Sequence, residues 1–558
     1  MNSKREEMTI KSLEKEIIEA AKVYVSEGMI PHLPFKGYSV FLETGERITF
    51  EKAYFERRRR LVVLGLGYYL DKRKDTKALL MQLLWEICNE YTWSLPAHLP
   101  IEKGYYTKEA KTTIDLFAAE TGQALSELLT LVGDDLDPLL NIRVLEEIDA
   151  RILSPFENKF WDWEDKENNW SAVIGGCIGM IALVVVKDSA RLSAIIDRLD
   201  RSMSSYLDGF GDDGACVEGV GYWDYGFGYF IYYAEKLQSV LGDSRYLSHP
   251  KVKAIAAFPY YTMIYPNKYL PFSDFADSTL SSGLLSFCHQ YFHVPVPQLS
   301  GGVSRLDSDH CYRFAPIYRN LSWYDKTITH PIATDAFRYY ESAQWLIVKK
   351  SALFFAAKGG HNQESHNHID VGHFVLGIDN TLFLTDLGAG EYTKEYFDDR
   401  FRYQFFVPSA QSHSIPIING VTQQEYGKNA IVEEVSRSRF DLSLTDFYPQ
   451  ACLDSYSRSF RLEENQLIVV DQFKFQQSNN TVEEQFVTEI EPQVVGQTVR
   501  LRKEDNICQL YFEIGEISVK TMRYKNHYGV ENKAYVIKVL SQHGHADHIK
   551  TVVSWNKD

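Results

Sequence analysis

The repeat period of the apolar residues changes once along this chain, and this change constrains the fold more than any other feature. Up to about residue 320, apolar residues recur at helical spacing, as in residues 53–70. After about residue 330 they form short alternating runs rich in β-branched and aromatic residues, as in residues 466–470. We therefore predict a helical domain over residues 1–325, for which helical hairpins stacked in a curved array or toroid fit, and an antiparallel β-domain over residues 326–558.

Length and charge limit the classes of protein to consider. The 558 residues exceed what one hydrophobic core organises, which agrees with more than one domain. The 59 Lys and Arg residues against 75 Asp and Glu residues give a net charge of −16. This sign is wrong for a protein that neutralises nucleic-acid phosphates, so we expect no nucleic-acid partner. A polyanionic ligand requires a locally basic groove.

The N-terminal residues and the cysteines indicate a cytoplasmic protein. Residues 1–16 are rich in charge and lack the apolar segment of a signal peptide. Seven scattered cysteines without a C-x-x-C pair indicate buried, reduced thiols. We expect a cytoplasmic monomer or homodimer, with secretion left open.

One segment approaches the length of a membrane span. Residues 170–186 are 17 residues without a charge, and they include three glycines. No second hydrophobic span accompanies this segment. We predict a helix buried on all sides in the helical domain, and no membrane association.

The richest polar segment is residues 359–374, with four histidines within thirteen residues. If residues 365–374 are extended, His366, His368 and Asp370 share one face. A hairpin turn at residues 377–380 then folds Asp386 back to within a few positions of His368.

These residues suit a metal site. His368 and Asp386 are expected co-ligands, and His413, which leads into the Asn419-Gly420 hairpin signal, supplies a third. Two imidazoles and a carboxylate suit Zn²⁺ or another first-row divalent ion. The alternative is that the histidines are exposed or hydrogen-bonded groups without a metal.

A second polar segment lies in the helical half. Tyr222, Tyr225 and Tyr229 fall at i, i+3 and i+7, and they follow a glycine-rich acidic loop that contains Glu218. Such a stripe is typical of a helix core, and it is also typical of a sugar-binding wall. Asn169, at the head of the apolar helix, is either part of an ordinary cap or a polar group directed into a cavity.

Two further motifs have simpler explanations. His543, His545, Asp547 and His548 match the H-x-H-x-D-H metal signature of metallo-β-lactamase-like hydrolases, but only ten residues follow, so we predict a polar turn between two strands. The arginine run 57–60 indicates a solvated helix face or part of a local basic groove rather than a nucleic-acid patch.

Together these motifs resemble the heparinase II/III-like polysaccharide lyases. The Ser-His-x-His-x-Asp run of that family resembles residues 365–370, and the similarity continues through residues 385–390 and 412–414. Residues 168–170 and 218–223 are similar more loosely. The resemblance implies an N-terminal (α/α) toroid followed by an antiparallel β-sandwich, with substrate in a cleft between them.

The resemblance also implies roles for individual residues. His366 is the expected catalytic histidine, Asn169 the residue that neutralises the substrate carboxylate, and Tyr222 the catalytic tyrosine. The tyrosine alignment is uncertain by one helical turn, so Tyr225 is an alternative. The implied metal ligands are His368, Asp386 and His413. Further catalytic or substrate-binding candidates are Glu218, Tyr392 and His361.

The chemistry of uronide cleavage explains these residue types. β-Elimination removes the weakly acidic C5 proton, so the charge that develops on the carboxylate must be stabilised by preorganised donors. A tyrosine or histidine takes the proton, a tyrosine protonates the leaving oxygen, and a 4,5-unsaturated product results. No organic cofactor is needed, and a Zn or Mn ion braces the site.

The resemblance makes a carbon–oxygen lyase acting on polysaccharides the first hypothesis. The expected substrate is an anionic polysaccharide or oligosaccharide, a glycosaminoglycan before alginate. A glycoside hydrolase using opposed carboxylates such as Glu218 and Asp224, or a non-catalytic sugar-binding protein, are the alternatives.

Overall fold

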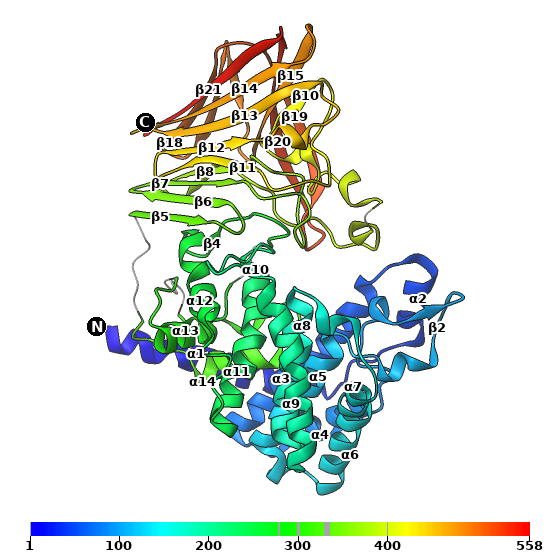
Figure 1. The fold of residues 1–558 in the computed structure, drawn as a ribbon. Helices are drawn as coiled ribbons and strands as arrows, with labels where there is room; N and C mark the ends of the chain where they lie inside the picture. Colours follow the sequence, from blue (N-terminus) through cyan, green and yellow to red (C-terminus); the bar gives the residue numbers. More distant parts are fainter. Residues whose placement is uncertain (1, 277–278, 298–301, 329–334, 399, 558) are drawn as a thin grey trace. The chain divides into compact units, whose positions relative to one another are not determined.

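The computed structural model describes residues 2–276, 279–297, 302–328, 335–398 and 400–557, which form two compact units (Figure 1). The helical unit comprises Met1–Phe210, Tyr222–Ala256 and Ser278–His330, and the sheet unit comprises Gly211–Gly221, Ala257–Asp277 and Pro331–Asp558. Helices followed by antiparallel sheets confirm the predicted fold class. Two short segments from the helical half of the sequence belong to the sheet unit, and the apolar pattern did not indicate this.

The first half of the chain is a succession of helices joined by loops. Their bounds are α1 (Asn2–Glu27), α2 (Phe35–Thr44), α3 (Ile48–Asp71), α4 (Lys74–Cys88), α5 (Leu116–Val132), α6 (Pro138–Ile148), α7 (Ser154–Asn158), α8 (Asn169–Val185), α9 (Ser189–Asp208), α10 (Val220–Tyr222), α11 (Gly228–Leu241), α12 (Pro250–Thr262), α13 (Ser282–Phe292) and α14 (Phe314–Ser322).

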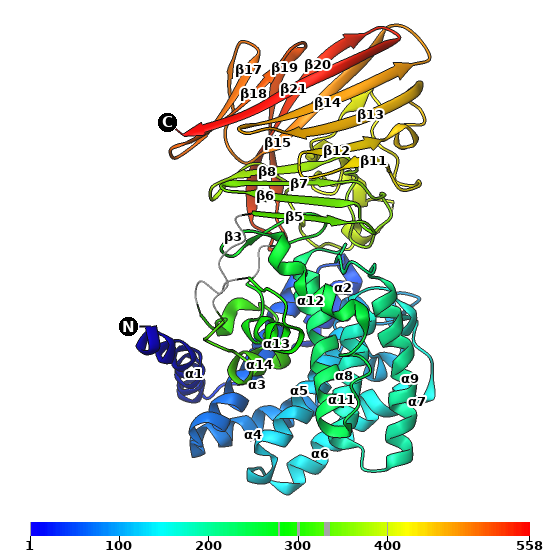
Figure 2. The same cartoon turned by 60° about the vertical axis from the view of Figure 1, so that its left-hand side comes forward.

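The helix α8 confirms the prediction of a buried apolar helix. Its residues from Ser171 to Leu183 are buried, and α11 runs beside it (Figures 1 and 2). A side chain at Gly176 would meet the carbonyl of Tyr229 at 2.8 Å, so glycine permits this close helix contact. Among the described residues, no helix combines the length and apolarity needed to cross a membrane.

The arginine run on α3 is buried, so the expectation of a solvated face or basic groove is wrong for most of it. Arg57, Arg58 and Arg60 are at most 7% exposed, and only Arg59 is partly exposed. Arg57 and Arg58 both pair with the buried carboxylate of Glu90, at 3.0 and 2.8 Å. Burial is tolerated because these charges are paired and hydrogen-bonded.

The sheet unit contains the long strands of the chain. Their bounds are β5 (Asp335–Tyr340), β6 (Trp345–Lys350), β7 (Leu353–Lys358), β8 (Phe374–Ile378), β9 (Thr381–Leu384), β10 (Ile417–Ile418), β11 (Ile431–Val435), β12 (Arg439–Ser443), β13 (Leu453–Leu462), β14 (Gln466–Phe475), β15 (Asn480–Thr488), β16 (Gln493–Val495), β17 (Thr498–Lys503), β18 (Asn506–Phe512), β19 (Glu516–Lys525), β20 (Glu531–His543) and β21 (Ala546–Lys557).

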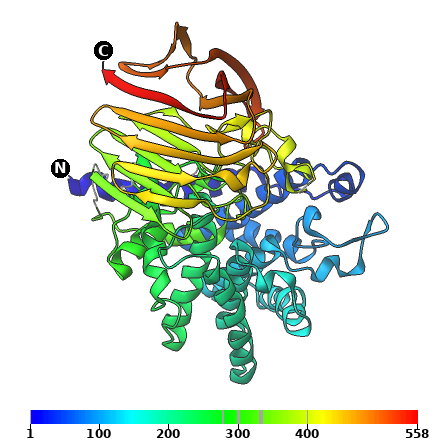
Figure 3. The same cartoon turned by 45° about the horizontal axis from the view of Figure 1, so that its top comes forward.

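Three antiparallel sheets share one core in this unit. Their strand orders are β5-β6-β7-β8-β9, β10-β15-β20-β19 and β11-β12-β13-β14-β21-β18-β17-β16. Figures 2 and 3 show β11 to β14 side by side in the largest sheet. Phe355, Phe486 and Phe460, one from each sheet, belong to the same buried cluster. Alternation along the strands places such residues on the inner faces.

The predicted hairpins form. Ile378 pairs with Thr381 across the β8–β9 turn, and a bulge then places Leu384 opposite Leu376. Ile418 pairs with Val421 across Asn419-Gly420. The C-terminal histidine motif forms the β20–β21 turn, as predicted, where the ring nitrogens of His543 contact Ser541 and Asp547.

Replacing the buried counter-charge on α3 should destabilise the helical unit. We expect Glu90→Gln to lower the free energy of unfolding by about 3–5 kcal/mol, because two buried arginines lose their negative partner. Denaturant unfolding measures this. Asp75→Asn, in an exposed pair with Arg73, is the matched control and should change little. Equal stability of the two variants would contradict the role of Glu90.

Candidate active site and metal centre

The histidine-rich loop 361–373 precedes β8 and is not extended, so the condition under which His366, His368 and Asp370 would share one face is not met. The backbone turns instead, with a hydrogen bond from Asn367 N to Glu364 O and left-handed φ angles of 56° at His366 and 88° at Gly372. Consequently His366, His368 and Asp370 do not present one face. His366 and His368 both reach Asp274, whereas Asp370 pairs with Lys358.

Asp274 receives two of these histidines. His366 Nδ1 lies 2.9 Å from Asp274 Oδ2, and His368 Nε2 lies 3.1 Å from Asp274 Oδ1. Tyr396 Oη and Arg402 Nη2 donate to the same carboxylate at 2.6 and 3.0 Å. Burial alone would raise the pKa of Asp274, but Arg402 and the histidines outweigh burial and hold it well below its usual range.

His368, Asp386 and His413 converge at a buried point. His368 Nδ1 lies 3.1 Å from His413 Nε2, and Asp386 oxygens lie 3.8 and 3.4 Å from these two nitrogens. Burial would raise the pKa of Asp386, but the surrounding histidines, His413 first, hold it well below its usual value. Asp386 therefore keeps a negative charge directed at the two rings.

The ring tautomers show that this cluster fits a cation. His368 Nε2 must donate, because ionised Asp274 only accepts, and His413 Nδ1 donates to Ser409 O at 2.9 Å. When both rings are neutral, the two remaining nitrogens point lone pairs at each other, which is unfavourable unless a cation lies between them. Asp386 Oδ2 is also buried without a hydrogen-bond partner. The ligand separations of 3.1, 3.4 and 3.8 Å are about those between ligands that bind one zinc ion at roughly 2.0–2.1 Å.

Two neighbours of the cluster have other functions. His373 Nδ1 accepts from Ser414 N at 2.8 Å, so its Nε2 carries the proton, and burial lowers its pKa well below the usual value. This Nε2 lies 3.7 Å from Asp386 Oδ2, which is beyond hydrogen-bond distance, and its proton leaves it no lone pair for a cation. Asp370 is near the cluster, but both of its oxygens lie within 3.0 Å of Lys358 Nζ.

Three other predicted residues also lie in the sheet unit. Glu218 accepts from Ser365 Oγ at 2.8 Å and lies 3.9 Å from His366 Nε2. The ring of Tyr392 is nearly parallel to His366, with centroids 6.4 Å apart. Both residues therefore surround His366. The imidazole of His361 accepts from Gln363 N within its own turn, and burial lowers its pKa.

Asn169 and the tyrosines lie in the helical unit. Asn169 is 3% exposed, and its Oδ1 lacks a hydrogen-bond partner. A Cβ at Gly226 would approach Asn169 Cβ at 3.1 Å, so the tyrosine segment packs directly on the start of α8. Residues Trp223–Phe227 form a π-helical turn. π-Turns frequently mark functional sites, and this one separates partly exposed Tyr222 from Tyr229, which is buried.

The hydroxyl of Tyr225 is already engaged. It donates to Glu120 at 2.6 Å, while the guanidinium of Arg313 lies 4.0 Å from its ring centroid and donates to Glu120 at 2.9 Å. Burial and Glu120 raise the pKa of Tyr225 well above its usual value. Tyr225 therefore forms part of a buried network with Glu120 and Arg313.

The helical unit has a histidine–carboxylate pair that the sequence analysis missed. His98 Nδ1 lies 2.7 Å from Oδ2 of buried Asp115, whose other oxygen caps α5 by accepting from Ala118 N. The ring of His98 contacts Trp170 with centroids 5.2 Å apart. The sequence showed His98 only as part of a proline-rich loop.

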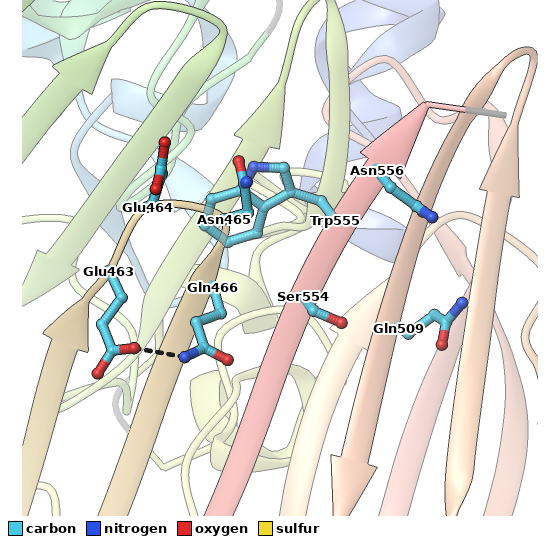
Figure 4. A pocket seen from close by; sticks show the side chains of 8 residues that line it. All are labelled: Glu463, Glu464, Asn465, Gln466, Gln509, Ser554, Trp555 and Asn556. Atoms are coloured by element: carbon cyan, nitrogen blue, oxygen red, sulfur yellow. Dashed lines mark hydrogen bonds between the residues drawn. The ribbon is translucent and has the colours of Figure 1, made fainter.

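A shallow groove on the largest sheet is a separate feature. It measures about 480 Å³, and Figure 4 shows Gln466, Ser554 and Gln509 on three adjacent strands and the Trp555 ring beside Asn465. Trp555 pairs with buried Cys508 across the strands and packs against the core. The residues that line the groove include no histidine and no tyrosine, so the groove lacks the acid–base side chains that β-elimination requires.

Comparison with solved structures identifies the fold as that of the polysaccharide lyases predicted above. Heparinase III aligns with a TM-score of 0.65 at 12% identity over 89% of this chain and 76% of that chain. Heparan sulfate lyase HepC from Pedobacter heparinus aligns at 0.61 and 12% identity over 91% and 77%. A mutant of the Streptomyces coelicolor A3 chondroitin AC lyase aligns at 0.53 and 10% identity over 97% and 79%.

These similarities confirm the predicted resemblance at the level of the fold, a helical toroid followed by antiparallel sheets. No protein-family model matches the sequence, and no curated protein matches it.

The residue with the most contacts in the sheet-unit site, Asp274, was absent from the sequence analysis. The available signal was weak: Asp274 lies beside Ser273 in the aromatic segment 269–276, and a second carboxylate, Asp277, follows directly. A carboxylate among large apolar residues indicates a buried, paired group. Its partners Tyr396 and Arg402 gave no comparable signal.

Metal content tests the cluster. We expect purified protein to retain about one divalent ion per chain, and His368→Ala to lose it and unfold at a lower temperature, because one of three converging ligands is gone. Elemental analysis by mass spectrometry and thermal unfolding measure this. His361→Ala, in the same loop, should keep the ion. Equal metal content in both variants would contradict the assignment.

Proposed function

We propose that this chain is a polysaccharide lyase that cleaves a uronic-acid-containing polysaccharide or oligosaccharide by β-elimination. The observation that supports this most is His366, a partly exposed histidine whose Nδ1 donates to a buried carboxylate. Its Nε2 then carries the lone pair that a general base requires. The fold shared with heparinase III supports the same reaction class.

In the proposed reaction, His366 Nε2 or Tyr222 takes the C5 proton, and Tyr222 gives a proton to the leaving glycosidic oxygen. Asn169 donates to the uronate carboxylate from its amide nitrogen, and its Oδ1, which lacks a hydrogen-bond partner, would accept from a sugar hydroxyl. Glu218 and Tyr392 surround His366 and would contact the sugar. Electrons from the C5–H bond form the 4,5-double bond as the C4–O bond breaks, so no water is consumed.

The metal ligands in this proposal are His368, Asp386 and His413. Two imidazoles and one carboxylate favour zinc, with manganese second. The bound ion would supply positive charge that holds the three ligands together. The rest of the site is positioned by side chains of this chain.

We propose a substrate class from the solved structures that share this fold. Solved relatives are described as heparan sulfate and chondroitin AC lyases, so we propose a glycosaminoglycan first and alginate second. The carboxylates considered for a hydrolase have other partners, since Glu218 accepts from Ser365 and Asp224 accepts from Ser281 N at 2.8 Å.

A direct assay tests the reaction. Purified protein incubated with hyaluronan, chondroitin sulfate, heparan sulfate and alginate should raise the ultraviolet absorbance of the conjugated double bond with at least one of them. New reducing ends without this absorbance would instead indicate a hydrolase. Binding of a glycan without either signal would indicate a sugar-binding protein.

Two substitutions test the roles. His366→Ala and Tyr222→Phe should each lower kcat by about 100-fold or more while the protein stays folded, because each removes an acid–base group. Matched controls are His545→Ala and Tyr105→Phe, which alter exposed residues. Initial rates from the absorbance assay and circular dichroism measure the outcome. Full activity in either test variant would place the acid–base site elsewhere.

A further inference from the structure

One carboxylate contacts both histidines of the loop. Asp274 Oδ2 accepts from His366 Nδ1, the proposed base, and Asp274 Oδ1 accepts from His368 Nε2, the proposed metal ligand. We infer that Asp274 is a positioning residue that fixes the tautomers of both rings at once and so links metal binding to the readiness of the base. For its effect on turnover, this inference rests on the proposed function.

Four donors occupy the carboxylate of Asp274 and fix which nitrogen of each histidine carries the proton that faces it. Each Asp274 oxygen accepts two hydrogen bonds, from His368 and Tyr396 on one side and from His366 and Arg402 on the other. An ionised carboxylate offers acceptor sites only, so both histidines must present N–H groups to it. In the neutral rings the opposite nitrogens then carry lone pairs. One of these faces His413, and the other lies near Glu218.

The backbone conformation shows that the surrounding structure holds Asp274 and His366 in their positions. Ser273, directly before Asp274, and His366 both have left-handed φ angles, 63° and 56°, although neither is glycine. Each such residue costs on the order of 1 kcal/mol or more and persists only where its surroundings determine it. Asp274 N also donates to His366 O at 3.2 Å. Main-chain and side-chain bonds therefore hold the same two residues together.

A third segment supports this pair. Ser273 Oγ donates to Val217 O at 2.7 Å, and Ser365 Oγ donates to Glu218 at 2.8 Å. Ser273 and Ser365, which precede Asp274 and His366, are thus both hydrogen-bonded to residues 217–218 of the sheet unit. The position of the carboxylate relative to the two rings therefore does not depend on side-chain packing alone.

Asp274→Asn is the decisive substitution because it keeps size and removes one acceptor oxygen. The amide can accept from one histidine, but its NH₂ group must donate toward the other, which then has to turn its lone pair away from the metal or from the substrate side. Either result breaks one function. A residue that only filled space would tolerate this change.

The first measurement is metal affinity by zinc competition with a chelator. We expect Asp274→Asn to bind zinc 10- to 100-fold more weakly. The second is steady-state kinetics with saturating zinc, where we expect kcat to fall at least 10-fold with KM within about twofold, because the base and not substrate binding is affected. Asp441→Asn, on β12 of the same unit, is the matched control and should change neither.

A third measurement needs no substitution of Asp274. ¹⁵N NMR of histidine-labelled, zinc-loaded wild-type protein should show His366 protonated at Nδ1 and His368 protonated at Nε2, with signals assigned from His366→Gln and His368→Gln. This keeps the inference testable if Asp274→Asn does not fold. The reverse tautomer at either ring would overturn it.

The outcomes separate this inference from the proposed function. Absence of lyase activity in the wild type contradicts the proposed function, while the zinc and NMR measurements still test Asp274. A wild-type kcat for Asp274→Asn at saturating zinc would show that Asp274 does not act on His366 and would overturn the link. Unchanged zinc affinity would overturn its action on His368.

Discussion

The buried carboxylate of Asp274 is the interaction on which the sheet-unit site depends. A charged group in this position is costly unless every lone-pair direction is satisfied, and here two histidines, a tyrosine and an arginine satisfy it. The same bonds leave the histidines no choice of tautomer. The requirement to stabilise one charge therefore determines which nitrogen of each ring is available for chemistry.

The cluster of His368, Asp386 and His413 follows from the same principle. Its two facing imidazole nitrogens and the carboxylate of Asp386 converge at one buried point, an arrangement that could hold a cation. Asp370 is neutralised by the ammonium group of Lys358 and not by a cation in the cluster. Two adjacent acidic groups are thus compensated in different ways, and only Asp386 is left directed at the two ring nitrogens.

The sequence predicted those parts of the molecule that depend on local patterns. The spacing of apolar residues along the sequence distinguished helices from strands. Turn-forming residues located both the β8–β9 hairpin and the Asn419-Gly420 turn. The joint contact of Asp386 with His368 was also predicted, although through an extended loop that does not form. The hairpin contains a bulge in β9, and His366 has a left-handed backbone conformation. The alternation of apolar and polar residues in the sequence indicates neither feature.

Prediction failed where a residue's environment is set by distant segments. The arginine run appeared solvated because Glu90, its buried partner, is about thirty residues away and carries no pattern that relates it to α3. Asp274 was missed for the same reason, since its segment joins the sheet unit from within the helical half. In both cases a charge that is buried must find its partner by tertiary packing. Isolated charges inside apolar segments are therefore the positions at which periodicity is least informative and a structure most informative.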